Sequence, residues 1–247
     1  MAVVEKTVDI IGDEALSALI LGRNIPEGFP VDLYDDAVRK LRSYGLYGTS
    51  GMQSVNFTNV TEVAGYAFAY CPDLKKVSLP NCKSFTGSYI FRSDANLEEV
   101  ELPALESVYE SSFSGCSKLT SVSLPKLVNC GNGLFASMNG LVSVSVPRLK
   151  STGSYAFNAS RAIKQIDLPS VTYIGDIAMS YCSSLEVVNI GPNITRIHAT
   201  AFANTPAGVV INLPVAEGVL ENAPWGATEA VIKYEVPYSG DVPIPED

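Results

Sequence analysis

Apolar residues recur along the chain with a period of 22 or 23 residues. The clearest copy of the pattern is the string LKKVSLP, which begins at Leu74. Related strings begin at Leu97, Leu119, Leu141, Ile163 and Leu185, with weaker copies at Met52 and Gly208. Six positions before these strings stand Phe68, Phe91, Phe113, Phe135, Phe157, Met179 and Phe202. One unit therefore reads LxxVxLPxLxxVxxxAFxxC, and the chain holds eight copies of it in register.

Each half of this unit predicts a different local structure. The V-x-L alternation predicts a short strand with one buried face, and the proline after it ends the hydrogen-bonded ladder. Apolar residues three apart in the second half predict a tight helical or turn return path. A single unit cannot bury its own apolar face, but stacked units can. We therefore predict an α/β solenoid over residues 51–214, a right-handed superhelix of about eight units with one parallel β-sheet.

The first fifty residues lack the repeat and predict an N-terminal helical cap. A helix is expected over residues 32–45, with aspartates in its first turn, basic residues near its end and Gly45 as its stop. Its apolar stripe consists of Leu33, Tyr34, Ala37, Val38, Leu41 and Tyr44. A shorter helix is expected from about residue 13 to residue 21.

The residues after the last copy predict a C-terminal cap over residues 215–236. Ile232, Tyr234 and Val236 alternate with charged residues, which indicates a closing strand. Trp225, the only tryptophan of the chain, is expected to plug the end of the core. The tail, residues 237–247, is rich in proline and acidic residues and is expected to be flexible.

The repeat also assigns most of the cysteines. Cys71, Cys116 and Cys182 occupy one position of the unit, which methionine, serine, threonine or aspartate fills in the other copies. Cysteine is expected to act there as a small core residue. Cys82 and Cys130 have less regular positions, and burial is the default expectation for them. With one histidine in the whole chain, no metal site and no cofactor are predicted.

The unit resembles that of a known family. The segment Tyr173 to Gly191, YIGDIAMSYCSSLEVVNIG, is similar to the consensus of the BspA-like (Treponema pallidum type) leucine-rich repeat, and the resemblance covers about residues 52–214. It implies a leucine-rich repeat fold and a bacterial surface protein that binds host proteins or other cells. Similar repeats occur in tail-associated proteins of phages and prophages, and the C-terminal string APWGATEAVIKY resembles the ending of such phage-encoded copies.

Charge and hydropathy narrow the classes of partner and the location. The net charge of −9 disfavours binding to nucleic acid or to anionic lipid. The chain has no apolar run of about 18 residues, so no membrane insertion is expected. Its first residues do not resemble a signal peptide, and its end does not resemble a cell-wall anchor. We expect an extracellular, cell-surface or virion location.

The outward-facing strand positions are the candidate partner-binding residues. They are Lys76, Ser78, Glu99, Glu101, Ser121, Ser123, Ser143, Ser145, Gln165 and Asp167. Glu99 and Glu101 are the one carboxylate pair among them, and roughly 6–7 Å of strand separates them, which overlaps the spacing in glycosidases. Lys76 is expected beside Glu99 on the neighbouring coil, in a solvated ion pair. No catalytic residue is therefore assigned.

Two remaining features leave alternatives open. His198 lies in a turn and has no repeated partner, so a role as a general base is the less favoured interpretation of this residue. Tyr66, Tyr89 and Tyr155 lie near one position of the unit, where tyrosine can form a binding surface or pack half-buried.

The sequence favours a non-enzymatic interaction or adhesion protein that binds a protein or glycan partner through the repeat surface. The alternative is a bacteriophage or prophage virion protein, tail-associated and receptor-binding or structural, that assembles as a homo-oligomer.

Overall fold

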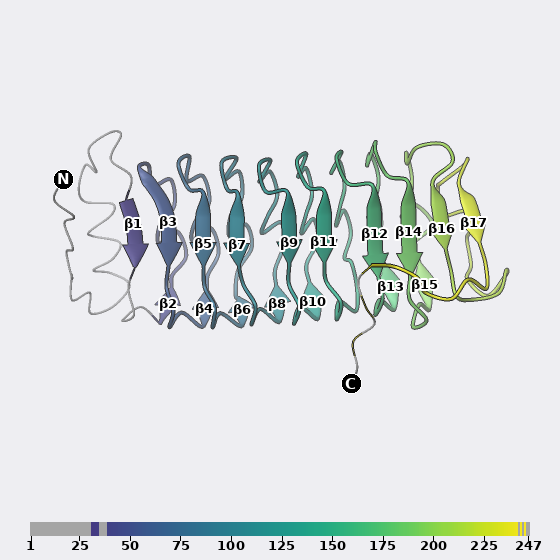
Figure 1. Cartoon of the computed structure of the whole chain (residues 1–247), viewed down its shortest axis with the longest axis horizontal. Coiled ribbons are helices and arrows are strands. Elements are labelled where there is room, and N and C mark those ends of the chain that lie inside the picture. Colours follow the sequence, from purple (N-terminus) through teal and green to yellow (C-terminus); the bar gives the residue numbers. More distant parts are fainter. Residues whose placement is uncertain (1–30, 35–38, 242, 244, 246–247) are drawn as a thin grey trace.

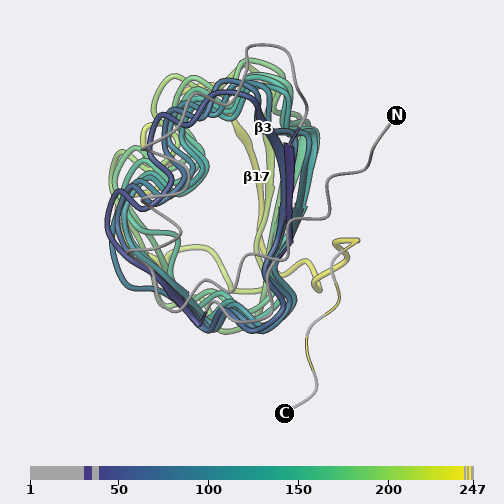
Figure 2. The same cartoon turned by 90° about the vertical axis from the view of Figure 1, so that its left-hand side faces the viewer.

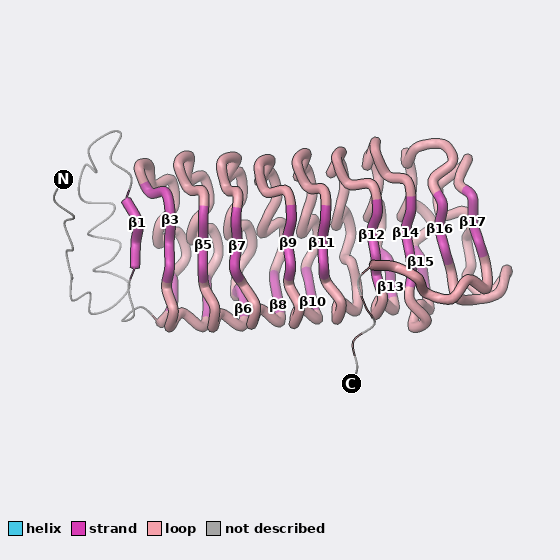
Figure 3. The backbone as a smooth tube through the Cα atoms, in the orientation of Figure 1, coloured by secondary structure: helices cyan, strands magenta, loops and turns pink. Residues whose placement is uncertain are grey.

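The chain winds into a tubular β-solenoid. The computed structural model describes residues 31–34, 39–241, 243 and 245. Figure 1 shows the coils side by side along the tube, and Figure 2 shows its closed oval cross-section from one end. Every regular element in the described residues is a strand, as the tube coloured by secondary structure shows in Figure 3.

One wall of the tube, the long-strand row, carries one strand per coil. Its members are β1 (Val31–Tyr34), β3 (Met52–Asn56), β5 (Lys76–Ser78), β7 (Glu99–Glu101), β9 (Ser121–Ser123), β11 (Ser143–Ser145), β12 (Gln165–Leu168), β14 (Val187–Ile190), β16 (Val210–Asn212) and β17 (Val231–Lys233). The strands pair in parallel and in register, so that Val55, Val77 and Val100 lie opposite one another. Hydrogen bonds divide the row into three sheets, β1-β3-β5-β7, β9-β11 and β12-β14-β16-β17.

A second wall, the short-strand row, consists of two-residue strands. They are β2 (Lys40–Leu41), β4 (Glu62–Val63), β6 (Ser84–Phe85), β8 (Ser107–Val108), β10 (Asn129–Cys130), β13 (Tyr173–Ile174) and β15 (Arg196–Ile197). They form two parallel sheets, β2-β4-β6-β8-β10 and β13-β15. The solenoid and its 22–23-residue repeat are therefore confirmed, whereas the single sheet and the α/β class are wrong for the described residues.

The return path is not helical because each coil places residues in the left-handed region of backbone conformation. Tyr66 and Tyr70, four residues apart, have φ of 60° and 61°, and the next coil repeats this at Tyr89 and Ser93. A left-handed residue interrupts a right-handed helix. The apolar residues three apart instead lie on either side of a sharp corner that leads into the short-strand row. Val60 precedes β4 and Val63 lies in it, and both side chains are fully buried.

The helix expected over residues 32–45 is wrong in its described part. Strand β1 pairs with β3, with Leu33 opposite Val55, and β2 pairs with β4, with Leu41 opposite Val63. Turns follow from residue 43. Strands β1 and β2 of this segment thus pair as a coil of the solenoid does, and Leu41 is buried in the core. The shorter helix expected at residues 13–21 lies outside the described residues.

A column of phenylalanine rings forms the centre of the core. Its members are Phe68, Phe91, Phe113, Phe135 and Phe157, and each side chain is at most 1% exposed. Neighbouring rings stack with centroids 5.2 to 5.9 Å apart. Trp225 continues the column beyond Phe202 with a centroid distance of 6.4 Å, and its indole N–H donates to the Glu221 carbonyl at 2.7 Å. Trp225 is fully buried and closes the core as predicted, and β17 extends the sheet at the position of the expected closing strand.

The cysteines of the repeat are core residues, as predicted. Cys71, Cys116 and Cys182 are fully buried, and each thiol donates to a backbone carbonyl of the preceding coil at 3.0 to 3.1 Å. Burial raises the pKa of Cys182 to about 12, so its thiol stays protonated at neutral pH. Cys82 is buried as well, and Cys130 is half-buried.

Aspartate replaces cysteine at the same position in one coil. Asp94 is fully buried, and its Oδ1 accepts the backbone N–H of Cys71 at 2.7 Å. Its Oδ2 has no hydrogen-bond partner in the described part of the chain. Burial raises the pKa of this carboxyl to about 9, so it is protonated at neutral pH.

Candidate binding surface

The ten predicted partner-binding residues lie on the outer side of the long-strand row, in two columns that flank its buried valines. We call this surface the strand face. The register places Lys76 opposite Glu99 and Ser78 opposite Glu101, and on the next strand pair Ser121 opposite Ser143 and Ser123 opposite Ser145. Gln165 and Asp167 stand at the equivalent repeat positions of β12, the strand that lies beside β11 in Figure 1. The exposed members are Lys76, Glu99, Glu101, Ser121, Ser123 and Ser143.

Paired charges occupy the end of the strand face near β5 and β7. The ammonium of Lys76 lies 2.8 Å from the Glu99 carboxylate, as predicted, and the Ser78 hydroxyl donates to Glu101 at 2.6 Å. The Lys76 and Glu99 side chains are 50% and 58% exposed. Both carboxylates are exposed, so neither lies in the buried apolar surroundings that a glycosidase gives to its catalytic acid.

The Lys76–Glu99 pair is expected to contribute little to stability. We expect Glu99→Gln to change the free energy of unfolding by less than about 1 kcal/mol, since solvent screens the charges and holding two long side chains costs entropy. Urea denaturation of both proteins would measure the difference. A loss of several kcal/mol would show that the pair supports the fold.

Small side chains hollow the middle of the strand face. An open groove of about 400 Å³ runs over β9, β11 and β12. Its polar lining residues are Ser121, Ser123, Ser143, Ser145, Gln165, Asp167 and Asp241. The serine hydroxymethyl groups leave room above the strands, and Val142, which is 57% exposed, adds an apolar contact beside them.

A hydrogen-bonded ladder fixes the far end of the strand face. The Asn212 amide donates to Asn189, and the Asn189 amide donates to the Asp167 carboxylate, both at 2.7 Å. The Gln165 amide donates to the same carboxylate at 3.0 Å, and so does the backbone N–H of Asp241 at 2.7 Å. Asp167 is therefore only 5% exposed and is a fixed part of the surface.

Tyrosines form a second surface, the tyrosine patch, which consists of Tyr44, Tyr47, Tyr66, Tyr70 and Tyr89. Centroids of neighbouring rings lie 4.9 to 6.5 Å apart, and the Arg92 guanidinium lies 4.8 Å from the centre of the Tyr89 ring. Of the three tyrosines singled out from the sequence, Tyr66 and Tyr89 belong to the patch and Tyr155 does not. Tyr44 and Tyr47 were missed because they fall in or beside the segment that was expected to be helical.

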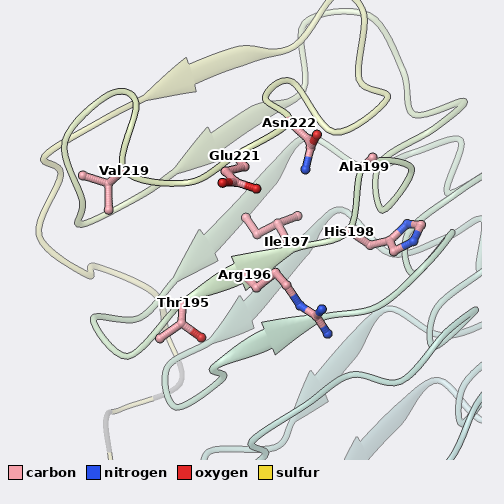
Figure 4. Close-up of a pocket in the computed structure, with 8 residues that line it drawn as sticks. All are labelled: Thr195, Arg196, Ile197, His198, Ala199, Val219, Glu221 and Asn222. Carbon is pink, nitrogen blue, oxygen red and sulfur yellow. The ribbon is translucent and has the colours of Figure 1, made fainter.

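His198 borders a pocket of about 450 Å³ between β15 and the loop before Trp225 (Figure 4). The lining residues are Thr195, Arg196, Ile197, His198, Ala199, Val219, Glu221 and Asn222. Nδ1 of His198 lies 2.8 Å from the Thr200 hydroxyl and 3.3 Å from the Asp176 carboxylate, and Thr200 also donates to Asp176. The Arg196 guanidinium lies 4.2 Å from the centre of the Tyr173 ring, outside this polar group.

Metal-ligating clusters and membrane-spanning helices are both absent from the described ranges. No group of three or more histidine, cysteine, aspartate or glutamate side chains there could hold a metal ion. No helix of that part of the chain has the length and apolar character that crossing a membrane requires.

The repeat matches a known family over most of the chain. The model described as the BspA type leucine-rich repeat region matches in six copies, over residues 31–142 and 85–207. The chain belongs to this family. The first match of the BspA-type repeat begins at Val31, where β1 begins, which agrees with a coil in the segment that was expected to be a cap.

Solved structures share the fold of this BspA-type chain. A leucine-rich repeat protein from Bacteroides ovatus is 24% identical with a TM-score of 0.58, covering 83% of this chain and 62% of its own. The chain thus spans less than two thirds of that protein. The T. pallidum leucine-rich repeat protein TpLRR is also 24% identical, with a TM-score of 0.56, covering 81% of this chain and 92% of its own. No curated protein sequence matches the chain.

Proposed function

We propose that this BspA-type repeat chain is a non-enzymatic binding module that holds a protein or glycan partner on its strand face. The observation that carries the proposal is the alignment of polar side chains in two columns along the parallel strands, where eight of them are paired in register. Four of these side chains are serines that line an open groove, so a partner can approach the backbone closely there. Strands about 4.8 Å apart offer such a partner the same contact once per coil.

The location and the class of partner follow from the family and the charge. A cell-surface role is proposed because the family resemblance implies bacterial surface proteins. The net charge of −9 repels phosphate backbones and anionic lipid, so a protein or a glycan is the better partner class.

A substitution on the strand face is expected to abolish partner capture. The pair Ser121→Arg and Ser143→Arg places two long cationic side chains in the groove, and both serines are exposed, so folding is preserved. Wild-type and variant chains would be used as baits for proteins of the native source and on a glycan array, with mass spectrometry and array signal as readouts. We expect at least a tenfold loss of bound partner.

The control places a single arginine on the other wall. Asn129→Arg lies on β10 of the short-strand row, is exposed, and is expected to capture the partner as the wild type does. Equal capture by the wild type and the strand-face variant would move the site away from this face, with the tyrosine patch as the next candidate.

The alternative, a virion component that assembles with itself, stays a prediction. A stable homo-oligomer in light scattering would support it, and a strict monomer would count against it.

A further inference from the structure

The C-terminal tail crosses back over the strand face. After β17 the chain runs from the end of the tube across β16 and β14 to β12 (Figure 1), and in Figure 2 this segment lies outside the wall of strands. The backbone N–H of Val236 still donates to Leu213 at 2.9 Å, so the segment leaves the last coil after this residue. Five residues later Asp241 is hydrogen-bonded to β12, which is 74 residues away in the sequence.

Two hydrogen bonds fasten the tail at this place. The backbone N–H of Asp241 donates to Asp167 Oδ2 at 2.7 Å, and the Asp241 carboxylate accepts the Gln165 amide at 3.2 Å. Tyr238 is half-buried beside the two aspartates, and burial raises the pKa of its hydroxyl. The strand face therefore offers one acceptor for a backbone N–H and one amide donor for a carboxylate.

Glycine is required in the middle of the fastened segment. A Cβ on Gly240 would lie 2.7 Å from the Asp167 carboxylate and 2.5 Å from the Tyr238 hydroxyl. The carboxylate cannot move aside easily because Asn189, Gln165 and the backbone of Asp241 all donate to it. A side chain at position 240 would thus push the tail off the strand face.

The groove continues from the tail onto free strand face. Asp241 and Pro243 form one side of it, and the exposed serines of β9 and β11 form its floor. The tail thus fills one end of the surface to which we assign partner binding and leaves the rest open.

We propose that residues 238–241 occupy the strand face as a tethered ligand, and that the partner of the strand face is an extended peptide of the same chemistry. Such a peptide has an aromatic residue, a spacer residue, a glycine and an acidic residue in this order. This inference rests on the proposed function and narrows its partner class to a polypeptide. The partner binds by displacing the tail, donating a backbone N–H to Asp167 and presenting a carboxylate to Gln165. A short tether holds its end at an effective concentration of about a millimolar. The docked tail therefore weakens the apparent affinity of every partner for this site by the same factor.

Removing the tail is expected to expose the peptide site. The probe is a synthetic peptide, Pro-Tyr-Ser-Gly-Asp-Val, which copies residues 237–242. It would be titrated into a chain that ends at Val236 and into the full chain, with the side-chain amide resonances of Gln165 and Asn189 followed by NMR. We expect saturable binding to the shortened chain and roughly tenfold weaker binding to the full chain, which corresponds to a tail docked about nine-tenths of the time.

Single substitutions separate docking from chain length. Gly240→Val in the full chain is expected to shift the Gln165 and Asn189 resonances to those of the shortened chain and to restore peptide binding. Ser239→Val is the matched control, because Ser239 is exposed, and it is expected to behave as the wild type. A peptide with valine in place of glycine is expected to bind at least tenfold more weakly than the original.

Two outcomes would overturn the inference. One is that the Gln165 and Asn189 resonances are the same with and without the tail, and the other is that the valine peptide binds as well as the original. If the peptide fails while Ser121→Arg with Ser143→Arg still abolishes partner capture, the tail inference falls and the proposed function stands. If the variant Ser121→Arg with Ser143→Arg captures the partner as the wild type does while the peptide binds, the proposed function is contradicted instead.

Discussion

Replacing Phe113 by alanine is expected to lower the free energy of unfolding by about 3–5 kcal/mol. The ring is fully buried, and its centroid lies 5.4 Å from that of Phe91 and 5.9 Å from that of Phe135. Its removal leaves a cavity between two coils and breaks the stacked column in the middle of the tube. Stability in a solenoid resides largely in the interfaces between neighbouring repeats, so the loss affects both halves of the array.

Urea denaturation followed by circular dichroism would measure this loss. Lys118→Ala, an exposed position on the same coil, is the control and is expected to stay within about 0.5 kcal/mol of the wild type. An unchanged melting temperature for Phe113→Ala would contradict the assignment of this residue to the core between coils.

Replacing Asp94 by asparagine is expected to raise the free energy of unfolding by about 2–4 kcal/mol at pH 7. In the folded chain the carboxyl pKa is about 9, against an ordinary value of 3.8. The unfolded chain therefore releases this proton well below pH 7, whereas the folded chain keeps it. Between about pH 4 and pH 9 the wild type loses stability as pH rises, and it is most stable, as far as this group is concerned, below pH 4.

Asparagine removes the titration and keeps the geometry. Its Oδ1 can accept the Cys71 N–H as the aspartate does, and its neutral amide replaces a carboxyl whose Oδ2 has no hydrogen-bond partner in the described part of the chain. Unfolding in urea at pH 5, 7 and 8.5 would test this. The expected result is a difference between variant and wild type that grows with pH. A difference that stays constant with pH would mean that the Asp94 carboxyl has the same pKa in the folded and unfolded chains.

A second substitution at Asp94 uses the chain's own precedent. Ser160 fills the same position of another coil, where it accepts the Met138 N–H at 3.2 Å and donates to the Phe135 carbonyl at 2.5 Å. Asp94→Ser is therefore expected to flatten the pH dependence as asparagine does, with a smaller gain because of its smaller volume.

The repeat in the sequence predicted those contacts that recur from coil to coil. The phenylalanine column, the buried cysteines and the Lys76–Glu99 pair follow from positions that recur every 22 or 23 residues, because stacked coils bring equivalent residues together. The outward-facing positions of the strand face follow from the same alternation. Their role in binding remains a prediction.

The return path and the first described coil were not predictable in the same way. Apolar residues three or four apart satisfy a helix and a corner of a solenoid equally well. Leu33, Leu41 and Leu46 align with Val55, Val63 and Phe68 one coil later. The segment lacks the LxxVxLP string, however, and its aspartates and basic residues imitate the charge pattern of a helix.

The contact of the tail has no sequence signal at all. Asp241 meets Asp167 across 74 residues, and no periodicity relates the two. Their meeting depends on where the last coil ends and on a glycine that lets the backbone approach, and both are properties of the assembled tube. Composition indicated only a flexible end.

Each coil of this tube is bounded by two others of nearly the same shape, and the parallel pairing is repeated from strand to strand. The number of coils in the tube can therefore change almost independently of the structure of each coil. Duplication or loss of one 22-residue block in the gene would lengthen or shorten the array by one step without creating a new kind of contact. The reach of the surface can thus be changed during evolution while the cross-section, and with it the interior, is inherited unaltered.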